Sequence, residues 1–406
     1  MTYIEQGTSS YKKALFALFS GSFVTFALLY TVQPLIPTFS DEFGASPTVA
    51  SLALSVSTGA LAISMLITPS LSDSIGRKPM MSISLVLASL LSILTALSPN
   101  FTVLLITRAL LGVVLAGFPS IAMTYVNEEF HPKGLGTVMG IYISGTSVGG
   151  LSGRVATGAL TDWFSWHMAL LIIGVISLLI SVWFWRNLPD ARHFTSQRLS
   201  FKKLFSTLGV HFKNPGLLCL YGLAFLLMGS FVTSYNYIGY LLMDPPYGLS
   251  QAFIGSVFFV YLVGTFSSTF MGKMADRAGK SKILPFSIFI MLVGAILTLS
   301  ENLVLKIFAI AVFTFGFFGG HSIASGWVGQ KALAYKAQAS SLYLLFYYAG
   351  SSLLGTTGGL FWSNFGWTGV IGMISVLLVI AMLLAGILAL SRKSNRNRLA
   401  QENQRI

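Results

Sequence analysis

The chain has 406 residues, of which 54% are hydrophobic and only 9% are charged. Soluble proteins carry about 25% charged residues, so this composition excludes an ordinary water-soluble domain and indicates a membrane protein. The formal net charge is +13, which could suggest nucleic-acid binding. The single cysteine, Cys219, excludes an internal disulfide and a cysteine-based metal site, and we expect neither a metal nor a cofactor.

Long apolar stretches recur from one end of the chain to the other, and each predicts a membrane-spanning helix. The twelve predicted spans lie at 14–38, 48–69, 80–98, 101–125, 134–160, 165–186, 214–242, 249–271, 284–301, 303–326, 337–363 and 366–390. The expected domains are a six-helix bundle at 1–186, a cytoplasmic linker at 187–213, a second six-helix bundle at 214–391 and a cytoplasmic tail at 392–406. Within the linker, 198–213 has the pattern of an amphipathic helix on the membrane surface.

The basic residues gather on one side of the predicted membrane. If both termini lie on the same side of the membrane, 22 of the 25 Lys and Arg residues fall in loops on that side. The exceptions are Lys306, Arg108 and Arg154. Because basic loops stay in the cytoplasm, we expect an inner-membrane protein with both termini cytoplasmic. The excess positive charge is then membrane topology and interfacial anchoring, and nucleic acid is not expected as a partner.

The second half of the sequence repeats the first. Asp73 and Asp276 lie 203 residues apart in similar loops, and Lys133 and Lys336 are separated by the same distance. The string that starts at Gly145 is similar to one that starts at Gly350. Matches at nearly one offset indicate two copies of a six-helix unit. Copies in the same orientation are related by an axis along the membrane normal.

Several motifs carry a resemblance to a known family. The loop between the second and third spans holds Leu71, Asp73, Gly76, Arg77 and Lys78, although Pro69 and Ser74 stand where the family has Gly and Arg; the second copy holds Gly272, Asp276, Arg277 and Gly279. The fourth span has Arg108 and Gly112, and the fifth has Gly145, Gly149 and Gly150, with Thr146 in place of a proline. Over essentially its whole length, the chain resembles the major facilitator superfamily, and within it the drug/proton antiporter branch and certain bacterial inner-membrane transporters.

The resemblance implies a fold, a mechanism and partners. The fold is all-α and membrane-embedded, with twelve helices in two pseudo-symmetric bundles that move in alternating access around a central site. The expected partners are a small-molecule substrate, protons and the lipid bilayer, and the expected state is a monomer. The two loops are expected to gate the cytoplasmic side, each carboxylate facing the start of a helix in the other bundle. The predicted gating residues are Asp73, Gly76, Arg77, Lys78, Asp276, Arg277, Gly279, Lys133 and Lys336.

Charged groups within spans are costly and usually functional. Arg108, Arg154 and His321 are therefore candidates for a proton or charge relay, with snorkelling to the interface or helix packing as the alternatives. Polar and aromatic residues predicted to line the substrate cavity are Tyr30, Gln33, Tyr235, Asn236, Tyr343 and Tyr347. An interfacial aromatic belt is the alternative for the tyrosines. Glycines predicted to serve helix packing are Gly112, Gly145, Gly149, Gly150 and Gly153.

Proton-coupled efflux of a small organic solute is the leading functional hypothesis, and it rests mainly on the resemblance. No Asp or Glu lies in the interior of any predicted span. A proton-independent or symport carrier of a polar solute, such as a sugar or an organic anion, therefore remains an alternative. An enzyme would need a metal-ligand or Ser/His constellation, and a channel would need pore loops or carboxylate rings. The sequence shows none of these, so we do not expect an enzyme.

Overall fold

The computed structural model describes residues 3–131, 135–194, 208–332 and 335–403, and α-helices dominate this part of the chain. A single β-bridge occurs there, between Ile4 and Phe130. The prediction of an all-α fold is therefore confirmed. The amphipathic helix expected at 198–213 falls mostly outside the described residues.

Ten helices of the described chain are long and apolar enough to cross a membrane, judged by length and composition. One of them, Gln338–Leu390, covers the last two predicted spans and bends at Gly366, whose backbone is not helical (φ 59°, ψ −151°). Helix α8 (Leu135–Trp163) occupies the fifth predicted span but is not among the ten, because it is rich in Gly, Ser and Thr. With α8 added and the bent helix counted as two, each of the twelve predicted spans coincides with helical chain in the described residues.

By its internal contacts the chain divides into two units. Unit 1 comprises Met1–Lys203 and Tyr235–Phe259, and unit 2 comprises Leu204–Ser234 and Val260–Ile406. Residues 235–259 thus pack with the first half of the sequence, although the repeat places them in the second half. The two six-helix bundles expected at 1–186 and 214–391 therefore remain a prediction.

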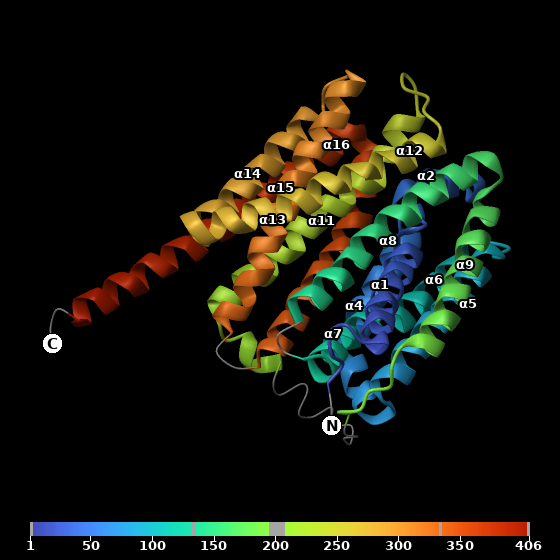
Figure 1. The fold of residues 1–406 in the computed structure, drawn as a ribbon. Coiled ribbons are helices and arrows are strands. Elements are labelled where there is room, and N and C mark those ends of the chain that lie inside the picture. Colours follow the sequence, from blue (N-terminus) through green and yellow to red (C-terminus); the bar gives the residue numbers. More distant parts are fainter. Residues whose placement is uncertain (1–2, 132–134, 195–207, 333–334, 404–406) are drawn as a thin grey trace. The chain divides into compact units, whose positions relative to one another are not determined.

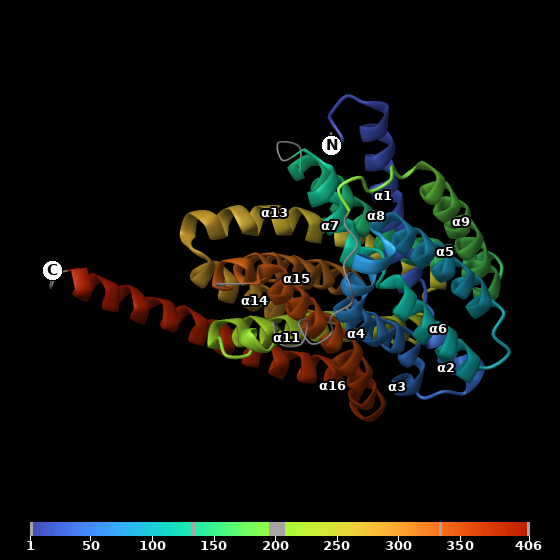
Figure 2. The same ribbon diagram turned by 90° about the horizontal axis from the view of Figure 1, so that it is seen from below.

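Unit 1 is built mainly from helix pairs that lie along each other. Helix α1 lies along α8, and α5 lies along α9 (Figures 1 and 2). The helices of this unit are α1 (Ser9–Tyr30), α2 (Ile36–Phe43), α3 (Pro47–Ala50), α4 (Leu52–Ile75), α5 (Arg77–Ala96), α6 (Phe101–Leu115), α7 (Pro119–Glu129), α8 (Leu135–Trp163), α9 (Trp166–Asn187), the end of α11 (Pro215–Met243), α12 (Gln251–Val257) and most of the 3-10 turn η2 (Phe258–Val260).

Unit 2 contains the first part of α11 and four further long helices. Helix α15 packs against both α13 and α14 (Figure 1). The elements are α13 (Tyr261–Ala278), α14 (Lys280–Leu297), α15 (Leu303–Lys331) and α16 (Lys336–Asn403). Helix α16 continues past residue 390, where the last span was expected to end.

Two of the predicted spans are broken near a proline. The first consists of α1 and α2 with an irregular stretch at 31–35 around Pro34, and the fourth consists of α6 and α7, broken before Pro119. Proline lacks the N–H that a helix interior needs, and its ring obstructs the preceding turn. The first break places Gln33 in non-helical chain between two helices.

The exposed surface is apolar and much of the interior carries small hydroxyls, as expected in a bilayer. Leu179 and Val304 are 67% and 78% exposed, whereas Ser57 and Thr58 are fully buried. Hydroxyls in hydrocarbon must find partners inside the protein. Thr58, for example, donates to the carbonyl of Ser55 one turn earlier (3.2 Å).

Candidate functional site

A chain of buried polar side chains in unit 1 links two helices through the irregular stretch at 31–35. Arg154 of α8 donates from Nε to Gln33 Oε1 (2.8 Å), and Gln33 Nε2 donates to Asn236 Oδ1 of α11 (2.9 Å). The three side chains are no more than 2% exposed. We call Arg154, Gln33 and Asn236 the amide relay.

The chemistry of arginine fixes the direction of the amide relay. A guanidinium can only donate, so Gln33 must turn its oxygen toward Arg154 and its nitrogen toward Asn236. Asn236 therefore accepts through Oδ1, and its Nδ2 group is left at the far end. This Nδ2 atom is buried and has no hydrogen-bond partner among the described residues. An unsatisfied buried donor costs about 1–3 kcal/mol, which makes it a candidate contact for a ligand or a water molecule.

Aromatic rings enclose the guanidinium of Arg154. Its Cζ atom lies 3.9 Å from the ring centroid of Tyr30 and 4.8 Å from that of Phe258. Tyr235 in turn stacks on Phe258 with centroids 5.1 Å apart. Such cation–π contacts stabilise a desolvated charge by about 2 kcal/mol.

Local backbone features make room for this arrangement. Arg154 also donates from Nη1 to the carbonyl of Gly150, one turn earlier on α8 (2.7 Å). A Cβ atom at Gly150 would lie 3.2 Å from the same Nη1, so a larger residue would crowd the guanidinium. The sequence placed Tyr30, Gln33, Tyr235 and Asn236 in the cavity and Arg154 in a charge relay without predicting that they meet. Phe258 was not predicted, since one phenylalanine among 32 carries no distinguishing signal.

Arg108, in α6, is buried differently. It is 1% exposed and donates to three backbone carbonyls: Ala53 in α4 (3.0 Å) and Leu28 and Leu29 in α1 (2.9 and 2.6 Å). Helix α1 ends at Tyr30, so the last two carbonyls belong to its final turn and lack intrahelical donors. Arg108 therefore caps α1 and ties it to α4 and α6. A relay role for this residue stays a prediction.

In unit 2, His321 of α15 meets the two predicted tyrosines of α16. His321 Nδ1 lies 3.0 Å from the hydroxyl of Tyr343, within hydrogen-bond distance, and the imidazole centroid lies 4.6 Å from the ring of Tyr347. On the other side His321 stacks with Phe317, with centroids 5.9 Å apart, and Phe317 stacks with Phe231 of α11. These groups form an aromatic cluster around one titratable imidazole. We call His321, Tyr343 and Tyr347 the histidine cluster.

Comparison with known proteins supplies the family. A sequence model of the Major Facilitator Superfamily matches residues 18–244 and 223–405. The chain belongs to this superfamily. It is 54% identical over 393 residues to the MFS-type transporter YybF of Bacillus subtilis, with 97% of each chain covered. It is 47% identical over 381 residues to the inner membrane transport protein YnfM of Escherichia coli, covering 94% of this chain and 91% of the relative.

Solved structures agree on the fold. A bacterial homologue of the human lysosomal transporter Spinster, crystallised inward-facing and unoccupied, covers 94% of this chain with a TM-score of 0.76 and 15% identity. The nucleoside transporter NupG covers 92% of it with a TM-score of 0.77 and 16% identity. The predicted family and fold are therefore confirmed. This member of the major facilitator superfamily is a multi-pass membrane transporter and not an enzyme.

The superfamily's first signature loop forms an ion-pair cluster in unit 1. Arg77 donates to Asp73 (2.6 Å) and, through two nitrogens, to Glu128 at the end of α7 (2.9 and 3.0 Å). Lys78 pairs with Asp190 (2.9 Å) after α9. Glu128 and Asp190 were not predicted, because neither belongs to the loop motif and only the fold brings them close.

The second loop differs from the first. Asp276 and Arg277 are exposed, as is Lys336, and no ion pair to any of them occurs among the described residues. Lys133 lies outside the described residues. Gly76 and Gly279 have φ of 108° and 95°, a backbone conformation that glycine adopts without strain, at the junctions of α4 with α5 and of α13 with α14. The gating role of both loops remains a prediction.

The predicted packing glycines bring helix backbones together. Gly145, Gly149 and Gly153 of α8 face the α1 backbone at Phe19, Phe23 and Ala27 respectively. Gly112 of α6 faces the backbone of Ser57 in the same way. Gly150 lies beside Arg154 instead, as described above.

Unit 1 also has a set of contacts near the ends of α2, α8 and α12. Asp162 accepts from the backbone N–H groups of Gln251 (3.0 Å) and Ala252 (2.8 Å) at the start of α12. The hydroxyls of Ser40 and Tyr240 lie 2.5 Å apart. We call these contacts the outer lock, because the predicted topology puts them on the outer side.

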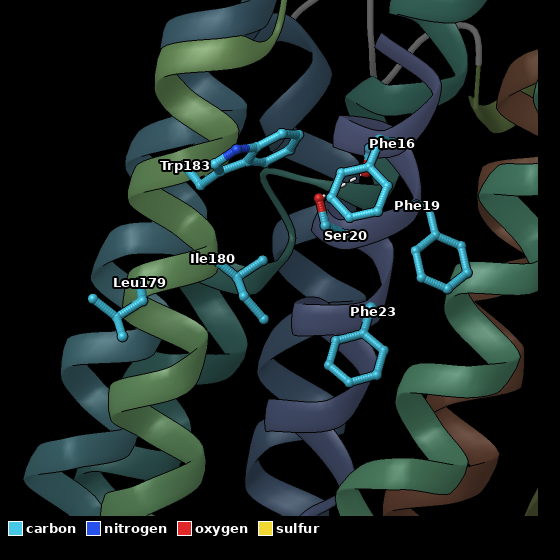
Figure 3. Close-up of a pocket in the computed structure, with 7 residues that line it drawn as sticks. All are labelled: Phe16, Phe19, Ser20, Phe23, Leu179, Ile180 and Trp183. Atoms are coloured by element: carbon cyan, nitrogen blue, oxygen red, sulfur yellow. Dashed lines mark hydrogen bonds between the residues drawn. The ribbon is translucent and has the colours of Figure 1, made fainter. Parts of the chain in front are cut away.

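A separate cavity of about 410 Å³ lies between α1 and α9 (Figure 3). It is lined by Phe16, Phe19, Ser20, Phe23, Leu179, Ile180 and Trp183. Its one hydroxyl, on Ser20, already donates to the carbonyls of Phe16 and Ala17 (2.8 and 3.1 Å). The cavity suits hydrocarbon rather than a polar solute, and no predicted substrate residue lines it. Among the described residues no group of three His, Cys, Asp or Glu side chains could hold a metal ion.

Proposed function

We propose that this transporter exports a small organic solute across the cytoplasmic membrane in exchange for protons, by alternating access, and that the amide relay forms part of its solute site. One observation carries the proposal: the hydrogen bond between Gln33 and Asn236. It joins side chains from opposite halves of the sequence within one polar cluster. Contacts of this kind must break and re-form when a carrier alternates.

The spacing of this pair supports a central position. Gln33 and Asn236 are 203 residues apart, which is the offset of the sequence repeat. They are therefore equivalent positions in the two copies. Equivalent positions can touch only near the axis that relates the copies, and carriers of this type bind substrate near such an axis at the middle of the membrane.

The ionisable groups of the spans break the repeat. At the local offset of 205, Arg154 corresponds to Gly359, and at the offset of 202, Arg108 corresponds to Ile310 and His321 to Pro119. Residues needed only for the shared fold tend to recur in both copies, as Gly145, Gly150 and Gly153 do at Gly350, Gly355 and Gly358. The one-sided placement of Arg154 and His321 supports roles in solute and proton binding rather than in the common architecture.

The histidine cluster is the proposed proton site. No Asp or Glu lies inside a predicted span, and histidine is the side chain whose charge changes most readily near neutral pH. The hydrogen bond to Tyr343 gives the imidazole a partner through which a proton could be exchanged. Arg154 and Arg108 stay the other two candidates for a proton or charge relay.

The two signature loops are the proposed cytoplasmic gate. In unit 1 Arg77 holds Asp73 and Glu128 together, so a change at any of the three would alter the others. We expect Asp73→Asn to reach the membrane but to transport more slowly, measured as initial solute flux per inserted molecule. Unchanged flux would remove the gating role. We further expect a monomeric carrier in the cytoplasmic membrane with both termini inside.

The alternative is a proton-independent or symport carrier of a polar solute. The lack of acidic residues in the predicted spans favours it, because antiporters commonly present a carboxylate to the proton.

Reconstitution in liposomes separates the two functions. The vesicles contain a pH-sensitive dye and carry an imposed pH gradient, and sugars, carboxylates and lipophilic cations are added in turn. Antiport predicts proton movement that depends on solute, lost in His321→Asn while solute counterflow persists. His167→Asn, a histidine in the first turn of α9 outside the cluster, is the control. Solute flux without proton movement, or proton movement in the same direction as the solute, would establish the alternative. A lack of flux for every solute class would contradict both.

A further inference from the structure

We propose that the amide relay binds an oxyanion group of the transported solute, so that the physiological substrate is an organic anion such as a carboxylate. This inference rests on the proposed solute site and adds the chemical class of the substrate to it. It is argued from the charge, the hydrogen-bond direction and the surroundings of Arg154, Gln33 and Asn236.

The first argument concerns charge. Arg154 is 2% exposed and is oriented by the Gln33 amide, the Gly150 carbonyl and the faces of Tyr30 and Phe258. Each of these contacts is with a neutral group. The predicted spans contain no Asp or Glu in their interiors. A solute that enters this region therefore meets a positive field, which attracts anions and repels cations.

The second argument concerns hydrogen-bond direction. Every bond in the amide relay runs from Arg154 toward Asn236, because the guanidinium cannot accept. The end group is Asn236 Nδ2, a buried donor that has no acceptor among the described residues. A carboxylate offers acceptors only, and it is the natural partner of a guanidinium. A protonated amine could satisfy neither end of this arrangement.

The third argument concerns shape. Phe258 lies over the guanidinium of Arg154 and stacks with Tyr235, so apolar ring surface adjoins the guanidinium. A ligand that pairs an oxyanion with an apolar or aromatic body fits both features.

Matched pairs of solutes test the assignment. Benzoate is compared with benzamide and gluconate with glucose, because each pair differs chiefly in the anionic group. Benzenesulfonate extends the series to a second oxyanion. Counterflow is measured in proteoliposomes, and binding is measured by the thermal shift of the purified protein. We expect the anions to be transported at least tenfold faster than their neutral partners and to be the only members that raise the melting temperature.

Electrical driving provides an independent readout. Outward movement of an anion and inward movement of a proton both carry positive charge inward. An inside-negative potential, set with potassium and valinomycin, should therefore accelerate benzoate export. A rate that does not respond to this potential would contradict export of an anion by proton exchange.

Two substitutions with matched controls locate the site. Asn236→Asp has almost the same shape as the native residue but places a carboxylate at the end of the relay, where it competes with the solute. We expect at least a tenfold loss of benzoate transport, against a smaller loss in Asn236→Leu, which removes the donor without adding charge. Arg154→Gln should abolish the preference for benzoate over benzamide, and Arg154→Lys should retain part of it. Protein amount and melting temperature show whether each variant folds.

The outcomes separate this inference from the proposed function. Solute-dependent proton movement in which benzamide moves as fast as benzoate would overturn the anion assignment and leave the antiporter intact. Benzoate transport that keeps its preference in Arg154→Gln would also overturn it. Anion-selective counterflow with no proton movement would support the anion site and contradict antiport.

Discussion

At the scale of single residues, two arginines buried to nearly the same degree have different surroundings. Arg108 donates to three backbone carbonyls and thereby completes the end of α1. Arg154 donates to one amide and one carbonyl and lies between ring faces. The first arrangement is fully occupied by the protein's own backbone, whereas the second adjoins an unsatisfied donor. We therefore propose a structural role for Arg108 and a role in solute binding for Arg154.

Replacement of Arg108 tests this distinction. Arg108→Ala removes one donor from each of three buried carbonyls, of which that of Leu28 keeps the Thr31 hydroxyl (3.2 Å). A buried group left unsatisfied costs about 1–3 kcal/mol. We expect a large fall in melting temperature and in the amount of protein in the membrane. Arg108→Lys keeps the charge but not the planar fork, so its loss should be intermediate. An Arg108→Ala protein that melts like the native one would contradict the capping role.

At the scale of elements, α1 and α8 pack through glycines spaced four residues apart. Gly145, Gly149 and Gly153 form one line along α8, and each faces backbone of α1. Because glycine has no side chain, the two backbones can approach closely along this line. Helices in lipid gain no hydrophobic energy by associating, so dispersion and Cα–H contacts between the close backbones hold the pair together. The same close approach keeps Arg154, one residue after this line, next to the irregular chain that holds Gln33.

A pair of alanine substitutions in α8 tests this packing. A Cβ atom at Gly149 would run into the Phe23 backbone, whereas one at Gly140 would have nothing within 4 Å. We expect Gly149→Ala to destabilise the protein by about 1–3 kcal/mol, as overpacking does, with a matching fall in melting temperature. Gly140→Ala should be neutral or stabilising by up to about 1 kcal/mol, because alanine favours helix more than glycine does. Equal melting temperatures for the two variants would contradict the close packing of α1 and α8 at Gly149.

At the scale of the whole molecule, residues 235–259 join the first unit although the repeat assigns them to the second half. The amide relay and the outer lock both include residues of this stretch, Asn236 in the first and Tyr240 and Gln251 in the second. Alternating access requires contacts on the outer side to open once in each cycle. The outer lock is the set of contacts in unit 1 that we expect to break at that step.

Asp162 provides the test. Its carboxylate accepts from two N–H groups at the start of α12, and a negative charge at a helix N-terminus is favourable by about 0.3–1 kcal/mol. In a Cys219→Ser background, Ile254→Cys places a thiol at a position that is 2% exposed. We expect Asp162→Ala to increase labelling of this thiol by a membrane-impermeant maleimide several-fold.

The control for this labelling is Asp244→Ala. Asp244 is an exposed acidic residue at the end of α11, and its carboxylate forms no hydrogen bond or ion pair among the described contacts. This variant should label at the native rate. Unchanged labelling in Asp162→Ala would show that the carboxylate does not hold the outer contacts together.

The sequence alone determined the membrane class, the helical fold, the repeat and the family. These features depend on the length of apolar stretches, the spacing of glycines and the loop motifs. Such patterns are local in the chain and can be recognised without knowing which residues are in contact. It also singled out the buried ionisable residues, since a charge in hydrocarbon is conspicuous by its cost. Tertiary structure decided what each of them touches. Arg108 caps a helix and Arg154 orients two amides because their partners lie 79 to 121 residues away along the chain, and no local pattern encodes which distant carbonyl, amide or ring a guanidinium will meet.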